Sequence, residues 1–337
     1  MNALRIAFLL LFTLSCAPAA RPPASSQHPH GRHVGVAGKR IWVEERGSGE
    51  PLVLIPGGGG GSHDYYHPYF DALSRSFRVI YYDGFGRGRS ERAAQRAEYS
   101  FDRDIEEVEA LRRALGLGKV HVLGHSYAGL VAEGYALRYP DSVNRLVLLC
   151  SFTSGADWQE SNEHVNETIK HQFPEAWSRI EQLRAKGLMS SAPEMQKAYY
   201  GHFDRMLAMI YFYNPIQASL LSMTAENFNP DAYYQLVGDD GDFVLGGDMA
   251  KVDFNAELQR LRMPVLVGMG RFDGIVTPRL SGRVARAIPH ATVVTFEKSG
   301  HFPFIEENEK VLEVLRRFLA PGGGAAGTPA ASSRAPL

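Results

Sequence analysis

Short apolar runs recur along the chain and alternate with segments of helical periodicity, which constrains the fold more than any other feature. The runs are rich in Val, Ile and Leu and are bounded by Gly, Pro or Asp, as is typical of strands buried on both faces. We expect strands over residues 51–55, 77–82, 120–123, 145–150, 264–269 and 292–296. We expect helices over residues 101–115, 128–138, 280–287 and 307–319. Strands that alternate with helices favour an α/β fold with a mostly parallel, doubly wound sheet.

The rest of the chain divides into a cap and two tails around this core. Residues 154–257 interrupt the alternation with polar and aromatic helix-like sequence, so we expect an inserted helical cap. The core then comprises residues 33–153 and 258–319. Residues 20–32 and 320–337 are dominated by small residues, proline and, in the first, histidine. We predict that both are disordered, because such segments bury too little apolar surface to fold.

The first 19 residues have the pattern of an export signal, with Arg5 ahead of an apolar run at residues 6–14. The run is shorter than the about 20 apolar residues that span a bilayer, so we expect no integral membrane span. Two processing routes fit the small residues that follow. Residues 17–19 resemble a cleavage site, whereas a lipobox-like sequence would leave a lipid anchor at Cys16. We therefore expect export to the periplasm or the medium.

Composition excludes several other classes of function. The 36 basic and 37 acidic residues are scattered without blocks, so we expect no nucleic-acid partner. The chain has two cysteines, Cys16 and Cys150. Because Cys16 lies in the segment to be removed or lipidated, we expect no intramolecular disulfide in the mature chain. The chain contains no H-E-x-x-H or C-x-x-C motif, and we predict neither a metal nor a cofactor. We interpret His28, His30 and His33 as a solvated spacer.

Residues 124–129, Gly-His-Ser-Tyr-Ala-Gly, stand between a predicted strand and a predicted helix. This is the setting of a nucleophile elbow, a sharp turn that lifts a serine above the sheet. The turn needs small neighbours, which Gly124 and Ala128 supply, although glycine is usual at the second position. The serine also lies at a helix N-terminus, whose dipole favours developing negative charge. We predict that Ser126 is a catalytic nucleophile.

Asp273 and His301 each follow the end of a predicted strand. Open α/β sheets hold their sites at the carboxyl ends of the strands, so we expect both side chains near Ser126. Serine needs a neighbouring base, which histidine supplies near neutral pH, and an aspartate orients that histidine. The chain order Ser, Asp, His is the one that elbow-containing hydrolases use. We predict a triad of these three residues.

The oxyanion formed by such an attack needs two backbone amides. The amide of Tyr127, directly after the predicted nucleophile, is the expected first donor. Residues 57–61 are all glycine and follow the first predicted strand, so their amides can approach a substrate closely. We predict that the amide of Gly58 is the second donor, with Gly57 and Gly59 as near alternatives. We also expect Gly57 and Gly59 to contact the substrate. No Lys-Ser/Thr pair follows, so a phosphate loop is not expected.

These motifs together resemble the α/β-hydrolase superfamily and, within it, the prolyl aminopeptidase (proline iminopeptidase) family. The resemblance covers about residues 33–319. It is carried by residues 57–58, 61–66 and 83–90, by the elbow with Tyr127, and by residues 270–273, 277–278 and 299–301. It implies the α/β-hydrolase fold, the triad named above, and release of an N-terminal residue, often proline, from short peptides. The segment 84–88 lacks G-x-G-x-x-G spacing, and we expect it to be a tight structural loop.

The family's substrate preference depends on carboxylates that bind the free α-amino group. Asp242 stands in a segment that resembles the family's acidic segment, where Glu is usual, and Gly274 follows the predicted acid where some members carry an acidic residue. Pro56 and Gly59 stand where the family's loop has His and Pro. A serine aminopeptidase with Asp242 at the amine is therefore the leading hypothesis. A carboxylesterase or lactonase acting on small esters is the alternative, and the sequence leaves the oligomeric state open.

Overall fold

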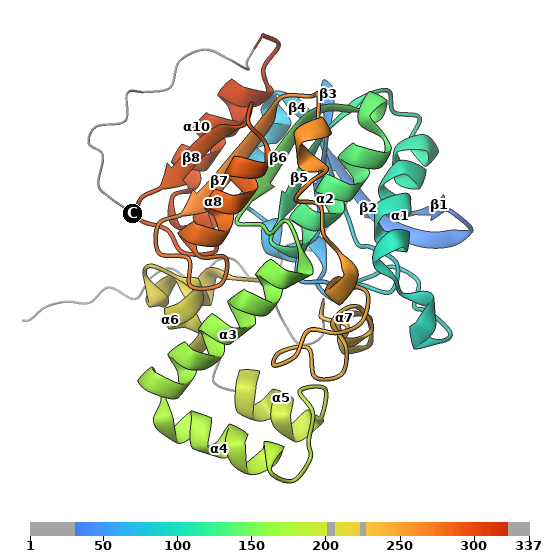
Figure 1. Cartoon of the computed structure of the whole chain (residues 1–337). Coiled ribbons are helices and arrows are strands. Elements are labelled where there is room, and N and C mark those ends of the chain that lie inside the picture. Colours follow the sequence, from blue (N-terminus) through green and yellow to red (C-terminus); the bar gives the residue numbers. More distant parts are fainter. Residues whose placement is uncertain (1–30, 201–205, 223–226, 323–337) are drawn as a thin grey trace, which may run out of the picture.

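The computed structural model describes residues 31–200, 206–222 and 227–322. Within them an eight-stranded sheet is flanked by helices, with further helices beyond one end of the strands (Figure 1). The strand order is β1-β2-β4-β3-β5-β6-β7-β8, and all pairings from β4 onward are parallel. The predicted fold class, a mostly parallel doubly wound sheet with a helical cap, is confirmed.

Each predicted strand is present, and its ends lie within two residues of the expected ones. The six strands are β3 Glu50–Ile55, β4 Phe77–Tyr82, β5 Val120–His125, β6 Val143–Leu149, β7 Val265–Gly270 and β8 Thr292–Phe296. Their side chains alternate between two apolar cores, one on each face of the sheet. Val53 and Ile55 lie in one core, and Leu52 and Leu54 in the other. A strand buried on both faces needs an uninterrupted apolar sequence, which is the signal that predicted these strands.

Two further strands, β1 Gly31–Val36 and β2 Lys39–Arg46, were not expected from the sequence. They form an antiparallel hairpin that extends the sheet beyond β4. β1 begins two residues before the expected start of the core at residue 33, so residues 31–32 are ordered strand rather than linker. The turn between the strands places Ala37 and Gly38 at φ 47° and 77°.

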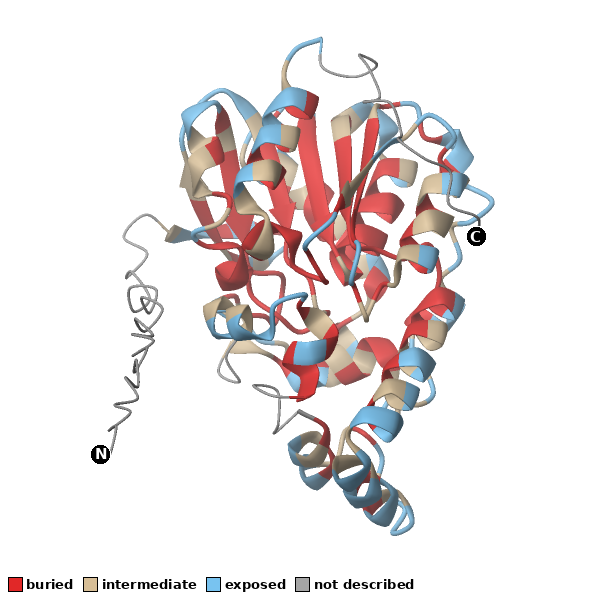
Figure 2. Ribbon diagram, turned by 90° about the vertical axis from the view of Figure 1, so that its left-hand side faces the viewer, coloured by how far each residue is buried: buried red, intermediate tan, exposed pale blue. Residues whose placement is uncertain are grey.

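Helices cover both faces of the sheet, as Figure 2 shows from the side with the buried strands in red. The helices on the first face are α1 Phe101–Ala114, α2 Tyr127–Arg138 and α8 Pro278–Ala287. On the other face lies α10 Asn308–Leu319. The ends of all four lie within two residues of the predicted ends. The layers leave the carboxyl ends of the parallel strands open to the cap.

The cap is formed by the helices between β6 and β7 (Figure 1). They are α3 Gly155–Gln172, α4 Pro174–Arg184, α5 Pro193–Tyr200, α6 Ala208–Tyr211 and α7 Pro230–Val237. Helices α3, α4 and α5 extend away from the sheet and share a small apolar core to which Ile210 of α6 also contributes. Helices α6 and α7 lie closer to the strands, so the cap covers the carboxyl ends of β5, β6 and β7.

Several expectations concern residues outside the described part of the chain. The export signal, Cys16 and nearly all of the two predicted disordered segments fall within residues 1–30 and 323–337. Among the described residues, none of the helices combines the length and apolar character needed to cross a bilayer. Cys150 is buried, with a free thiol.

Glu133 on α2 is fully buried, and neither of its carboxylate oxygens has a hydrogen-bond partner among the described residues. Burial, and then the nearby charge of Asp157, raises its pKa well above the usual range. Because the unfolded chain ionises this group first, native stability is lost as the pH rises above about 4.3 toward the folded-state pKa. Each pKa unit of this shift costs about 1.4 kcal/mol once the pH exceeds both values.

Glu133→Gln removes this ionisation while keeping the side-chain shape. We expect the free energy of unfolding of the variant, relative to that of the natural protein, to rise between pH 4 and pH 8 in urea titrations. Glu163→Gln, on the exposed surface of α3, is the matched control and should show no such trend. Parallel pH profiles for Glu133→Gln and the natural protein would contradict the assignment.

Candidate active site

Ser126 occupies a sharp turn between β5 and α2. Its φ of 58° and ψ of −127° put a non-glycine residue in a strained region of backbone space. A Cβ atom at Gly124 would lie 2.2 Å from the carbonyl oxygen of Ala128, so the turn requires glycine there. The methyl group of Ala128, which stands where glycine is usual, is fully buried and accommodated. The local sequence therefore folds into the expected elbow, with Ser126 lining a cavity.

His301 and Asp273 lie side by side in the loops after β8 and β7. The distance from His301 Nδ1 to Asp273 Oδ2 is 2.9 Å, and both side chains are buried. The other carboxylate oxygen accepts hydrogen bonds from the amides of Ile275 at 2.8 Å and Val276 at 2.9 Å. Because a carboxylate accepts, His301 carries its proton on Nδ1, which leaves Nε2 able to act as a base. His301 and Ser126 line the same cavity.

The cap helix α6 contacts the loops that carry this pair. The amide of His301 donates to the carbonyl of Tyr211 at 2.6 Å, and the amide of Gly274 donates to that of Ile210 at 3.1 Å. A Cβ atom at Gly274 would lie 2.7 Å from the same Ile210 oxygen. No side chain fits at this position without displacing the cap. The departure from an acidic residue after Asp273 therefore has a steric cause.

The two predicted oxyanion donors both border the cavity. Tyr127 is the first residue of α2, where helical amides have no partner within the helix. Gly58 lines the cavity with a φ of 75°, a conformation that favours glycine. The pairing of these two amides as an oxyanion hole stays a prediction.

The two alternatives to Gly58 are less well placed to donate into the cavity. The amide of Gly57 donates to the hydroxyl of Tyr65 at 3.0 Å, although the residue borders the cavity. Gly59 lines a smaller pocket behind the loop, and its carbonyl accepts from Arg87 Nε at 2.9 Å. The engaged amide of Gly57, and the position of Gly59 outside the described lining of the main cavity, favour Gly58 as the second donor.

A hydrogen-bonded chain that sequence reasoning missed connects the glycine loop with the histidine loop. Tyr65 accepts from Gly57 and lies 3.3 Å from His125 Nδ1. His125 Nε2 donates to the carbonyl of His301 at 2.7 Å. Burial, and then the proximity of His301, lowers the pKa of His125 well below its usual value, so the ring is neutral. Tyr65 lies in a segment that the family resemblance singled out, but the sequence gives no sign of its partner.

Tyr65→Phe should weaken this chain at its centre. The variant leaves the buried amide of Gly57 and His125 Nδ1 without this partner, which costs about 1–3 kcal/mol of stability. We expect kcat to fall about tenfold as the glycine loop loses its support, as measured by steady-state kinetics and thermal unfolding. Tyr69→Phe, which removes a hydroxyl bonded to the Leu220 carbonyl at 2.7 Å, is the control and should not change kcat. Equal kcat values for both variants would contradict a positioning role.

A buried ion pair between Arg87 and Asp104 contacts both segments that carry the proposed oxyanion donors. Arg87 donates to both oxygens of Asp104 at 2.7 Å and also holds the carbonyl of Gly59. The hydroxyl of Tyr127 donates to Asp104 Oδ2 at 2.5 Å. The loop expected to be tight is indeed crowded, since a Cβ atom at Gly88 would lie 2.2 Å from a carboxylate oxygen of Asp83. Its arginine links the glycine loop to the helix that follows Ser126.

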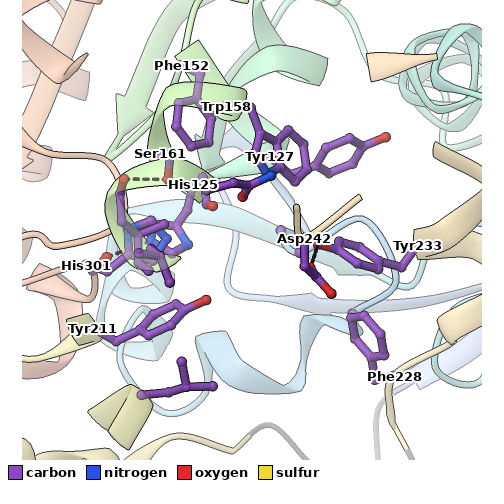
Figure 3. A pocket seen from close by; sticks show the side chains of 18 of the residues that line it. His125, Tyr127, Phe152, Trp158, Ser161, Tyr211, Phe228, Tyr233, Asp242 and His301 are labelled. Carbon is purple, nitrogen blue, oxygen red and sulfur yellow. Dashed lines mark hydrogen bonds between the residues drawn. The ribbon is translucent and has the colours of Figure 1, made fainter. Parts of the chain in front are cut away.

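The cavity beneath the cap has a volume of about 490 Å³. Its described walls are mainly aromatic and aliphatic, as Figure 3 shows from close by. They include Phe152, Trp158, Leu207, Tyr211, Phe228 and Tyr233. Asp242 is the one acidic side chain among the described lining residues. The space suits a small, largely apolar ligand.

Asp242 is buried and follows the end of α7. Its Oδ1 accepts from the hydroxyl of Tyr233 at 2.9 Å (Figure 3). Its Oδ2 accepts from the hydroxyl of Tyr234 at 3.2 Å. Its backbone is held by Asn166 and Ser190 at 3.0 Å and 3.3 Å. The structure thus brings Asp242 to the same cavity as Ser126 and His301.

The chain is similar to the alpha/beta hydrolase family model, to proline iminopeptidases and to an esterase. The family model described as alpha/beta hydrolase fold matches residues 50–308. A proline iminopeptidase of Saccharolobus solfataricus is 28% identical over 275 residues, which cover 81% of this chain and 86% of that protein. The solved proline iminopeptidase of Mycobacterium smegmatis superposes with a TM-score of 0.68 at 24% identity, covering 86% of this chain and 97% of its own. An esterase from Thermogutta terrifontis gives 0.63 at 21% identity, with coverages of 86% and 98%. At such identities, the two structures support the fold alone.

Proposed function

The chain belongs to the alpha/beta hydrolase family, and on that premise we propose that it is a serine aminopeptidase that releases N-terminal, proline-like residues from short peptides. The observation that carries the proposal is the carboxylate of Asp242, the one acidic side chain among the described residues of a mainly aromatic and aliphatic cavity that Ser126 and His301 also line. The similar protein from Saccharolobus solfataricus, named a proline iminopeptidase, supports the same substrate class.

In the proposed mechanism, Ser126 Oγ attacks the carbonyl carbon of the first peptide bond while His301 Nε2 takes its proton. Asp273 holds Nδ1 and stabilises the imidazolium. The carbonyl oxygen becomes an oxyanion, which the amides of Gly58 and Tyr127 stabilise. Collapse of this intermediate breaks the C–N bond, and the leaving amine takes the proton from His301. Water then attacks the acyl-enzyme with His301 as base, which releases the amino acid and restores the serine.

Asp242 gives this chemistry its selectivity for an N-terminal residue. The two tyrosine hydroxyls fix the orientation of the carboxylate, and a substrate ammonium would add a charge-assisted hydrogen bond. The cavity volume of about 490 Å³ suits a small side chain such as a proline ring and lies in the range of small-molecule sites.

A panel of substrates tests the proposed class. We expect purified protein to hydrolyse arylamides of proline or alanine with a free amino group. The same arylamides with the amino group acetylated should be poor substrates, because the ammonium is lost. Turnover of p-nitrophenyl acyl esters without turnover of any aminoacyl arylamide would rule out the peptidase proposal.

Asp242→Asn tests the amine contact directly. A hydrogen bond to a charged group is worth about 1.5–3 kcal/mol, so we expect kcat/KM for arylamides to fall roughly 10- to 100-fold. Ester hydrolysis needs no ammonium contact and should change little. Asp239→Asn, in the same segment but exposed and paired with Arg96, is the matched control and should leave both activities intact. Equal losses on arylamides and esters would show that Asp242 acts through the structure of the cap.

A carboxylesterase or lactonase acting on small esters is the second candidate. It is favoured by the fact that both oxygens of Asp242 already accept tyrosine hydrogen bonds. The described lining residues also offer a single carboxylate where an ammonium would gain from two. The substrate panel separates the two candidates, because only the aminopeptidase depends on a free amino group.

A further inference from the structure

Away from the cavity, Glu44, His63 and His67 converge at the junction of β2 with the segment after the glycine loop. Glu44 lies on β2, His63 begins the short helix His63–Tyr66, and His67 follows it. Glu44 Oε2 lies 3.7 Å from His63 Nε2 and 3.8 Å from His67 Nε2. The ligand atoms of all three side chains lie within 4.8 Å of one another. Glu44 and His63 are fully buried, whereas the His67 side chain is 10% exposed.

A carboxylate orients each of the two imidazole rings from the opposite side. His63 Nδ1 lies 2.7 Å from Asp83 Oδ1, and His67 Nδ1 lies 2.7 Å from Asp71 Oδ1. The carboxylates accept, so both Nδ1 atoms carry hydrogen and both Nε2 atoms face Glu44. A histidine that binds a metal through one nitrogen usually donates the other to a carboxylate in this way. The arrangement supplies both the ligands and the groups that orient them.

The surroundings of the cluster favour positive charge. The ring nitrogens of His63 lie 2.7 Å, 3.7 Å and 3.8 Å from carboxylate oxygens of Asp83, Glu44 and Asp64. Three carboxylates around one imidazole attract a metal cation to this position.

We propose that Glu44, His63 and His67 form a binding site for a single divalent transition-metal ion of the zinc class, with Glu44 Oε2 and the two Nε2 atoms as ligands. Two imidazoles and one carboxylate are a ligand set that suits zinc, and a water molecule entering beside His67 completes four-coordination. Zinc bonds of about 2.0–2.2 Å in a tetrahedron place the ligand atoms about 3.4 Å apart, close to the separations found here.

The ion acts as a structural brace, because none of its three ligands is among the described residues that line the cavity. It joins β2 to the helix His63–Tyr66, whose Tyr65 holds the amide of Gly57. Metal binding therefore stabilises the native protein and the glycine loop without taking part in bond cleavage.

The test titrates Zn²⁺ into full-length, chelator-treated protein by calorimetry, with thermal unfolding in parallel. We expect one tight site per chain and a higher unfolding temperature with the metal. His67→Gln, at the most exposed ligand, should weaken binding at least about 100-fold, and Asp71→Asn about 10- to 100-fold through the orienting carboxylate. His171→Gln, at an exposed histidine on α3, is the matched control and should bind as the natural protein does.

Two other groups of residues could bind added zinc, so the design separates them. His125, Cys150 and His301 also place ligand atoms within 4.8 Å of one another, and His28 and His30 precede the described residues. We expect the tight site to persist in His301→Ala and in the double variant His28→Gln/His30→Gln. Co²⁺ should give a four-coordinate absorption spectrum that His67→Gln abolishes. Equal binding by His67→Gln and the natural protein, or no binding by either, overturns the proposal and leaves the cluster as a hydrogen-bonded network of histidines and carboxylates.

Discussion

Ser126→Ala is expected to lower kcat by about 10⁵- to 10⁶-fold, the loss typical of removing a serine nucleophile that acts together with its base. The methyl group keeps the backbone conformation at φ 58°, so the fold should persist. Steady-state kinetics on the best arylamide or ester give the rate. Mass spectrometry of protein treated with a fluorophosphonate should find the label on Ser126 alone.

Ser161→Ala provides the matched control for this substitution. Ser161 lines the same cavity, and its hydroxyl donates to the carbonyl of Ile275 at 2.7 Å (Figure 3). The control loses a hydroxyl beside the site without losing the nucleophile, so its rate should stay within tenfold of the natural one. Unchanged turnover in Ser126→Ala, or equal losses in both variants, would refute the mechanism whatever the substrate.

The sequence predicts the central strands well because a strand buried on both faces consists of an uninterrupted run of apolar residues. β4 is an example, since Val79 and Tyr81 face one core while Ile80 and Tyr82 face the other. β2 escaped prediction because it lies near the edge of the sheet, where charged residues such as Arg40 and Glu44 interrupt the apolar residues. Its place is set by pairing with β4 rather than by its own composition.

The candidate site likewise has a part that the sequence predicts and a part that it does not. Ser126, Asp273 and His301 could be proposed because parallel strands bring their carboxyl ends to one edge, so strand assignment alone places such residues together. The hydrogen bond from Tyr65 to His125 spans 60 residues and depends on how a loop packs against the sheet. No local pattern encodes such a contact. The part of the cavity wall that the cap supplies is equally hard to predict, because its residues come from separate segments that meet through tertiary packing.

Arg87→Met should lower the free energy of unfolding by about 3–5 kcal/mol, because it removes one partner of a buried ion pair. The substitution leaves the carboxylate of Asp104 buried, with the hydroxyl of Tyr127 still donating to it, and it releases the carbonyl of Gly59. Burial, and then Asp104, already raises the pKa of nearby Glu107 to about 8, and Arg87 opposes that rise. Loss of the guanidinium thus leaves two acidic groups in an apolar setting.

Urea unfolding of single and double variants separates this charge effect from simple loss of packing. Arg87→Met/Asp104→Leu removes both charges, so it should be more stable than Arg87→Met alone, since a buried pair can be replaced by apolar groups at little cost. Arg89→Met, at a half-exposed arginine paired with Asp64 at 3.0 Å, should cost at most about 1 kcal/mol. Should the double variant recover stability but not kcat, the pair's contribution to catalysis lies in holding Gly59 and Tyr127 in place. A double variant no more stable than Arg87→Met would instead assign the loss to packing.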